Sequence, residues 1–169
     1  MSGKQLPAVF ITGLFETHLK VRNLERSMEF YEKILGLELG MKERARRVAF
    51  YWIGGQGKSV LGLWEKPPWV LGGNAGDQII TQHFAFEIDS ADLGSAVAGI
   101  KQRGTELRNF FGEITHVPSV FGWVPAASIY FNDPDGHLLE FIAKLPGKAK
   151  PEIGVVSLDE WNRLNQSAN

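Results

Sequence analysis

The chain of 169 residues contains no cysteine. This absence excludes disulfides, thiolate nucleophiles and sulfur-ligated metals, so any metal would need histidine, carboxylate or water ligands. No apolar run approaches the roughly 20 residues that a membrane span needs. The N-terminus also lacks the apolar core and cleavage pattern of a secretory signal. We therefore expect a cytoplasmic protein with no membrane partner.

An excess of charge of either sign is absent as well. The sequence has 18 Lys and Arg against 19 Asp and Glu, a formal net charge of −1. A near-neutral balance argues against a nucleic-acid partner, which would require a dense basic patch. The hydrophobic share of 44% is that of an ordinary globular protein. The length is enough for one compact domain with a real core.

The predicted elements occur twice in the same order. The first set is a strand, an amphipathic helix and three strand-like runs, at 15–21, 23–36, 37–42, 47–53 and 59–64. The second set repeats this order at 82–88, 90–104, 107–111, 128–131 and 137–143. Asn23 and Ser90 are the expected helix caps, and Gly36 and Gly104 the expected helix stops. This order predicts an α+β fold of two tandem βαβββ repeats that form a cleft or partly open barrel.

Composition divides the chain into parts. We expect a leader at 1–13, a domain at 14–144 and a linker with a short C-terminal helix at 145–169. Within the domain, repeat one spans 14–66 and repeat two spans 80–144, separated by a Pro- and Gly-rich stretch. Ser157 is the expected cap of the C-terminal helix. Three apolar residues form a stripe along this helix, which we interpret as a packing surface: Leu158, Trp161 and Leu164.

Two histidines lie on the less apolar faces of the first strands. His18 and His83 have matching places in the two repeats, and Glu140 lies on the last strand. A lone strand histidine is more often structural or solvated, but the symmetry of the pair favours a metal site. Two histidines and one carboxylate can bind a divalent metal (Fe, Mn, Ni, Co or Zn) and leave coordination positions open.

The chain resembles the vicinal oxygen chelate superfamily, which includes glyoxalase I, extradiol dioxygenases, fosfomycin-modifying thiol transferases and bleomycin-resistance proteins. The similar stretches are T-H-L-K-V-R-N-L-E-R-S-M-E-F-Y-E-K-I-L-G-L-E-L, Q-H-F-A-F-E-I and S-I-Y-F-N-D-P-D-G-H-L-L-E-F. The resemblance covers about residues 14–144. It implies that His18, His83 and Glu140 are metal ligands, that Tyr130 supplies an active-site hydroxyl, and that the protein is a homodimer.

The chain also departs from the members of this superfamily. Glyoxalase-like members supply a fourth ligand, usually Glu, where this chain has Gly62. Glu65 lies three residues further, so a regular strand would turn it to the other face unless a bulge intervenes. Extradiol dioxygenases need an additional histidine before the second ligand, and none lies between His18 and His83. Fosfomycin-modifying members carry a hydroxyl where this chain has Lys20.

Other candidate residues have a weaker basis. His116 lies in the irregular stretch 112–127, where a surface-loop histidine is the simpler interpretation. His137 lies three residues from Glu140 and should face the opposite side. Aromatic residues near strand ends and loops could wall an apolar pocket or simply pack in the core: Trp64, Trp69, Phe110, Phe111, Phe121 and Trp123.

We expect a metal-dependent, glyoxalase-like lyase, isomerase or related transferase that binds a small substrate through two neighbouring oxygens. Glu140 would be a ligand and base, and Tyr130 a hydrogen-bond donor. One alternative is a ligand-sequestering protein of the bleomycin-resistance type that performs no reaction. Another is an extradiol-type dioxygenase or a thiol transferase. A dimeric scaffold with a vestigial metal site is a further possibility.

Overall fold

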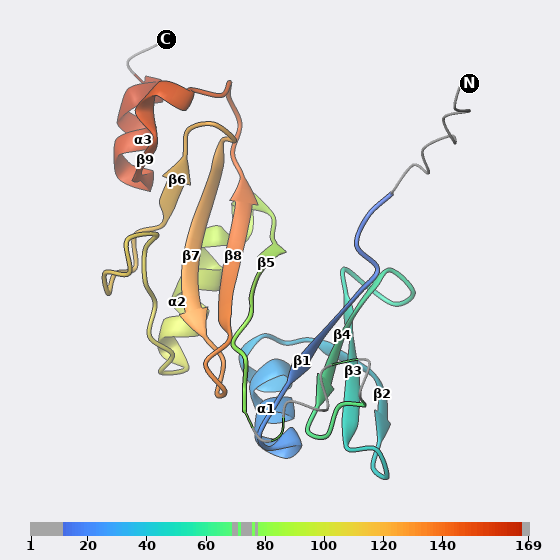
Figure 1. Cartoon of the computed structure of the whole chain (residues 1–169). Helices are drawn as coiled ribbons and strands as arrows, with labels where there is room; N and C mark the ends of the chain where they lie inside the picture. Colours follow the sequence, from blue (N-terminus) through green and yellow to red (C-terminus); the bar gives the residue numbers. More distant parts are fainter. Residues whose placement is uncertain (1–11, 69–70, 72–75, 77, 167–169) are drawn as a thin grey trace, which may run out of the picture.

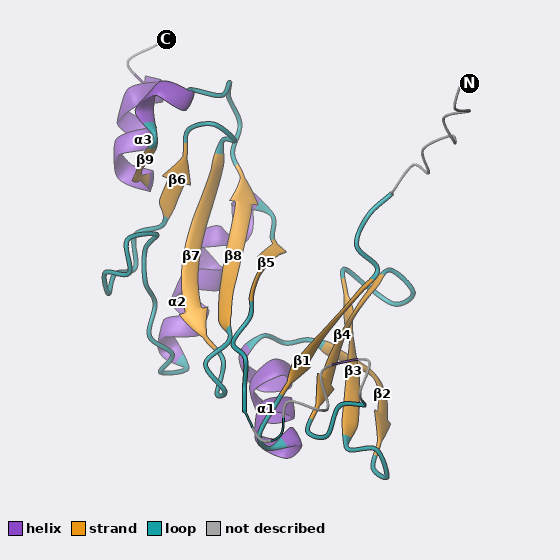
Figure 2. Ribbon diagram, viewed as in Figure 1, coloured by secondary structure: helices purple, strands orange, loops and turns teal. Residues whose placement is uncertain are grey.

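The computed structural model describes residues 12–68, 71, 76 and 78–166 of the chain. Its strands form two sheets, with the orders β1-β4-β3-β2 and β5-β8-β7-β6-β9. The expected α+β fold is confirmed, and the two sheets splay apart without closing into a barrel (Figure 1, Figure 2). Within the described ranges, no helix is long and apolar enough to cross a membrane.

The first sheet contains all the strands of the first repeat. Its elements are β1 (Glu16–Lys20), α1 (Leu24–Glu29), β2 (Glu38–Glu43), β3 (Val48–Ile53) and β4 (Ser59–Trp64). Strand β1 pairs in parallel with β4, and the other neighbours are antiparallel. A parallel pair needs a long crossover connection, which here contains α1, β2 and β3.

The predicted ends of the first helix are confirmed. The Asn23 side chain accepts a hydrogen bond from the Arg26 backbone N–H at 2.8 Å, as an N-cap should. After Glu29 the helix widens into a π-helical turn, Phe30–Ile34. The chain then turns at Gly36, whose φ of 71° lies in the left-handed region that glycine adopts without strain.

The second repeat has the same order. Its elements are β5 (His83–Glu87), α2 (Leu93–Gln102), β6 (Ser119–Phe121), β7 (Ala126–Asn132) and β8 (Leu138–Lys144). Strand β5 is parallel to β8, as β1 is to β4. The expected cap at Ser90 is wrong, because Asp89 instead accepts from the Ala91 N–H and begins a 3₁₀ turn before α2.

The strand expected at 107–111 is also wrong. Arg108 makes only isolated bridges, to Ile114 and Tyr130. The side chain of Asn109 accepts hydrogen bonds from the backbone N–H groups of Phe111 and Glu113, each at 3.0 Å. Such local side-chain bonds compete with a sheet ladder and fold the segment into a turn. The corresponding strand is β6, which lies inside the stretch expected to be irregular.

One apolar core connects the helices with the sheets. It joins α1 and α2 to the inward faces of the strands, and its largest buried side chains include Tyr31, Tyr51, Phe131, Leu19, Leu24, Leu61, Leu63, Ile100, Ile129 and Leu139. Leu19 of β1 therefore points into the core, and Glu16, His18 and Lys20 lie on the opposite face of the strand.

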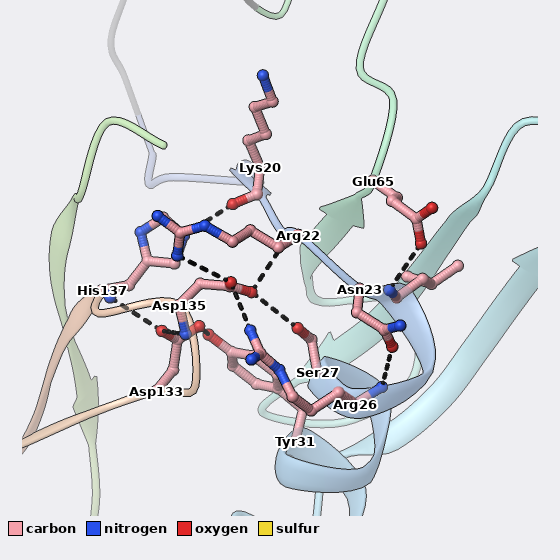
Figure 3. A network of polar contacts seen from close by, with 11 residues as sticks. Lys20, Arg22, Asn23, Arg26, Ser27, Tyr31, Glu65, Asp133, Asp135 and His137 are labelled. Carbon is pink, nitrogen blue, oxygen red and sulfur yellow. Dashed lines mark hydrogen bonds and ion pairs between the residues drawn. The ribbon is translucent and has the colours of Figure 1, made fainter. Parts of the chain in front are cut away.

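The β7–β8 hairpin of the second repeat is bonded to α1 of the first (Figure 3). At its tip, the fully buried Asp135 carboxylate accepts hydrogen bonds from the Arg26 guanidinium at 2.6 Å and from the Ser27 hydroxyl at 3.1 Å. Asp133 accepts from the Tyr31 hydroxyl at 3.0 Å. Burial and the neighbouring Asp133 charge raise the Tyr31 pKa, so this hydroxyl stays a donor. The turn therefore fixes the two repeats to each other.

His137 adds a third connection at the same place and is fully buried. Its Nδ1 accepts from the Gln82 backbone N–H at 3.1 Å, so in the neutral ring Nε2 carries the proton and donates to the Lys20 carbonyl at 2.9 Å. Both ring nitrogens are thus used in joining β1 to the second repeat. His137 is a structural residue.

The C-terminal extension is docked on the second sheet. Strand β9 (Val155–Ser157) pairs with β6 and leads into α3 (Leu158–Gln166). Ser157 caps this helix as expected, accepting from the Glu160 N–H at 3.2 Å. Trp161 is buried, whereas Leu164 is 39% exposed. The predicted stripe therefore docks mainly through Trp161.

Gly122 allows the extension to approach β6 closely. Its N–H donates to the Gly154 carbonyl at 2.8 Å, and a Cβ added at Gly122 would lie 2.3 Å from the Lys150 carbonyl oxygen. We expect Gly122→Ala to destabilise the fold by about 2 kcal/mol through overpacking. Chemical denaturation would measure the loss, with Gly94→Ala as the control, because a Cβ at Gly94 would meet nothing within 4 Å. An unchanged midpoint for Gly122→Ala would contradict this close packing.

Candidate metal centre

His83 lies at the start of β5 with one ring nitrogen free for a metal. Its Nδ1 is 3.1 Å from the Leu138 carbonyl oxygen, which can only accept, so Nδ1 carries the proton. In the neutral ring the lone pair is then on Nε2, which lies 3.2 Å from Oε2 of Glu140. A backbone carbonyl that fixes the tautomer in this way is typical of metal-binding histidines.

Glu140 points from β8 toward His83 and is nearly buried, with its side chain 6% exposed. Its second oxygen, Oε1, is buried and has no hydrogen-bond partner among the described residues. An unpartnered buried carboxylate oxygen is costly, and a bound cation would satisfy it. The donor set of His83 and Glu140 therefore fits a divalent metal.

Tyr130 lies on the same face of the second sheet as Glu140. It is the cross-strand neighbour of Glu140, and its ring centroid lies 6.0 Å from that of His83. Burial, and then the Glu140 charge, raise the pKa of Tyr130 to about 12. The hydroxyl therefore stays protonated at neutral pH and can donate a hydrogen bond.

His18 lies in a different environment on the first sheet. Its Nε2 is 2.9 Å from Oε1 of Glu16, and its Nδ1 accepts a hydrogen bond from the Trp64 indole N–H at 2.9 Å. The structure pairs His18 with Glu16 and His83 with Glu140. Nowhere in the described part of the chain do three or more His, Asp or Glu side chains gather closely enough to hold a metal. The three predicted ligands thus lie in two separate groups within one chain, the His18 pair and the His83 pair, which we call half-sites.

Glu65 does not join either half-site. Its carboxylate accepts from the Leu24 N–H at 2.9 Å and from the Arg47 guanidinium, and the Arg47 bond lowers the Glu65 pKa. Glu65 therefore binds the start of α1. It lies three residues after Gly62, and this odd number places its side chain on the opposite face of the strand.

The aromatic residues form two groups. Trp64 makes edge contacts with His18 and Phe50 on the first sheet. Phe110 contacts Phe111 and Phe121 beside the second sheet. Trp69 lies outside the described residues.

An apolar hollow of about 290 Å³ lies next to Glu16. Its apolar lining is made by Met41, Phe50, Trp52 and Val60. His116 is exposed and borders a different hollow, between α2 and α3.

Comparisons with known proteins agree with this arrangement of elements. Residues 13–141 match the model of the Glyoxalase/Bleomycin resistance protein/Dioxygenase superfamily. A lactoylglutathione lyase of Neisseria meningitidis is 32% identical over 142 residues, covering 79% of this chain and 92% of that protein.

Solved structures are similar as well. An integron cassette protein from the Halifax Harbour sewage outfall metagenome shares 35% identity at a TM-score of 0.63, covering 79% of this chain and 99% of the other. The fosfomycin resistance protein FosX of Listeria monocytogenes, complexed with Mn(II) and sulfate, shares 26% identity at a TM-score of 0.56, covering 80% and 93%. This chain belongs to the Glyoxalase/Bleomycin resistance protein/Dioxygenase superfamily, also known as the vicinal oxygen chelate superfamily.

Proposed function

We propose that the protein is a divalent-metal-dependent, glyoxalase-like enzyme that acts on a small molecule through two neighbouring oxygens. The observation that carries this proposal is the His83–Glu140 pair: Nε2 of His83 lies 3.2 Å from one carboxylate oxygen, and the other oxygen is buried without a hydrogen-bond partner among the described residues. Lactoylglutathione lyase activity of a relative at 32% identity supports a reaction of this class.

A bound divalent ion would polarise the substrate oxygens and stabilise negative charge as it develops. The chain's own residues have complementary roles. Glu140 offers a carboxylate oxygen that can accept a substrate proton, and the Tyr130 hydroxyl can donate a hydrogen bond to a substrate oxygen. The low exposure of Glu140 keeps bulk water from its carboxylate.

The first repeat would supply the remaining protein ligand from β1, where His18 and Glu16 lie 2.9 Å apart. Because the two half-sites are on different sheets of one chain, a second copy of the chain would bring them together as a homodimer. Exposed apolar side chains on the first sheet, including Leu39 at 40% and Met41 at 43%, support such a contact.

Metal analysis of protein purified without a histidine tag tests the proposal. We expect about one divalent ion per site in the wild type and loss of stoichiometric metal in His83→Ala, because Nε2 is the ligand atom. His116→Ala changes an exposed loop histidine and should retain the metal. Thermal melting verifies that both variants are folded. Full metal content in folded His83→Ala would contradict the proposed site.

A ligand-sequestering protein without a reaction is the second candidate function. It is favoured by the apolar hollow beside β1, whose lining of Met41, Phe50, Trp52 and Val60 suits an aromatic ligand. Calorimetric titration with an aromatic ligand distinguishes the two. Tight binding by metal-stripped protein, with no metal-dependent turnover of glyoxalase substrates, would favour sequestration.

A further inference from the structure

The backbone hydrogen bonds at the ends of β1 and β5 align the two repeats residue by residue. The Val21 N–H donates to the Trp64 carbonyl at 2.9 Å, and the Ile88 N–H donates to the Ile142 carbonyl at 2.9 Å. Each bond directly follows the last residue pair of its parallel ladder, β1 with β4 and β5 with β8. Val21 therefore corresponds to Ile88.

Two register positions follow from this alignment. In the first parallel pair, Glu16 lies opposite Val60, and His18 lies opposite Gly62. In the second, His83 lies opposite Leu138, and Ala85 lies opposite Glu140. The residue that corresponds to His83 is therefore Glu16, and His18 lies two residues further along. The expected match between His18 and His83 is wrong by two positions.

The ring of His18 fills the space above Gly62, the counterpart of Glu140. A Cβ added at Gly62 would lie only 2.4 Å from Nδ1 of His18. The first half-site thus has a carboxylate in the place of His83 and an imidazole near the place of Glu140. The pairs are similarly close, at 2.9 Å between Glu16 and His18 and 3.2 Å between His83 and Glu140.

The tautomer of His18 determines which member of the first pair can bind a metal. An indole N–H can only donate, so the Trp64 bond requires a lone pair on Nδ1 of His18. The proton of the neutral ring is then on Nε2, which donates to Oε1 of Glu16. Neither nitrogen of His18 has a lone pair left for a metal, in contrast to His83.

We propose that Glu16 is the metal ligand of the first repeat and that His18 is a positioning residue that orients its carboxylate. The inference rests on the proposed metal-dependent function. Glu16 retains a second oxygen for the ion, and its side chain is 43% exposed on the face of β1 that points away from the core. The ligand set is then Glu16, His83 and Glu140, and two carboxylates favour harder ions such as Mn²⁺.

Titration of metal-stripped, tag-free protein with Mn²⁺, with free Mn²⁺ measured by electron paramagnetic resonance, tests the assignment. We expect Glu16→Gln to weaken Mn²⁺ binding at least about 100-fold, because a ligating charge is lost. His18→Gln should weaken it by only about 10-fold, since outer hydrogen-bond partners contribute about 10–100-fold and a glutamine amide can still donate to Glu16.

Two further variants sharpen the test. Glu38→Gln removes an exposed carboxylate from β2 of the same sheet and should bind Mn²⁺ like the wild type. Glu16→His should retain a metal and shift the preference from Mn²⁺ to Zn²⁺, because it places an imidazole where the second repeat has His83.

The two proposals fail in different ways. Loss of Mn²⁺ binding in folded His18→Gln, with wild-type affinity in Glu16→Gln, would overturn the role of Glu16 and leave the metal-dependent function intact. A wild-type protein that binds neither Mn²⁺ nor Zn²⁺ would overturn both.

Discussion

Replacing Asp135 by alanine is expected to lower the free energy of unfolding by about 3–5 kcal/mol, the usual loss when one partner of a buried ion pair is removed. The Asp135 side chain is fully buried and accepts hydrogen bonds from the Arg22 N–H, the Arg26 guanidinium and the Ser27 hydroxyl. Ser27 is itself fully buried, so its hydroxyl would lose its partner with no water to replace it.

Urea denaturation followed by circular dichroism measures this loss. Asp159→Ala, in the exposed first turn of α3, is the matched control and should cost less than about 1 kcal/mol. Asp135→Asn should lie between the two, because the amide keeps an acceptor for Ser27 but presents no negative charge to Arg26. If Asp135→Ala and Asp159→Ala had equal midpoints, the hairpin would not be what joins the repeats.

The periodic features of the fold could be predicted from the sequence, whereas this connection could not. Alternating and helical patterns locate the repeats, and the Asp-Pro-Asp-Gly residues between β7 and β8 are of the types that form turns. The same residues look like simple turn formers in the sequence. Their partners, which run from Arg22 just before α1 to Tyr31 just after it, are 102 to 113 residues away, so no local pattern indicates the contact.

For the candidate site, the sequence predicted the strand face of the histidines but not their relative positions along the strands. Strand alternation has a period of two, so it assigns His18 to the correct face of β1 but does not fix its position along the strand. Shifting by two residues leaves every side chain on the same face. Only the ladder with β4 shows that Glu16, and not His18, corresponds to His83.

Trp64 was likewise predicted only as part of an aromatic cluster. Its hydrogen bond to His18 spans 46 residues and depends on Gly62, which leaves room for the imidazole ring beside β4. A sequence pattern can indicate that a histidine faces a cleft. It cannot indicate which ring nitrogen carries the proton, because the partner of the other nitrogen decides that.

Glu140→Gln is expected to stabilise the metal-free protein while abolishing its stabilisation by metal. Without a metal, the Nε2 lone pair of His83 faces the Oε2 of Glu140 at 3.2 Å, and Oε1 is buried without a partner among the described residues. A glutamine amide can donate to that lone pair and carries no charge into the buried site. We therefore expect a gain of about 1 kcal/mol in unfolding free energy without metal.

Mn²⁺ should make the wild type more stable than Glu140→Gln, the reverse of the order expected without metal. An ion that binds only the folded wild type stabilises it by about 2.7 kcal/mol when present at 100 times its dissociation constant. Glu140→Gln, which lacks the ligating charge, should gain nothing. Thermal melting with and without Mn²⁺ measures both effects, with Glu87→Gln as control, because Glu87 is an exposed partner of Lys144. If Glu140→Gln is less stable than the wild type without metal, the buried carboxylate stabilises the fold. If Glu140→Gln is more stable without metal and less stable with Mn²⁺, the carboxylate is a cation ligand.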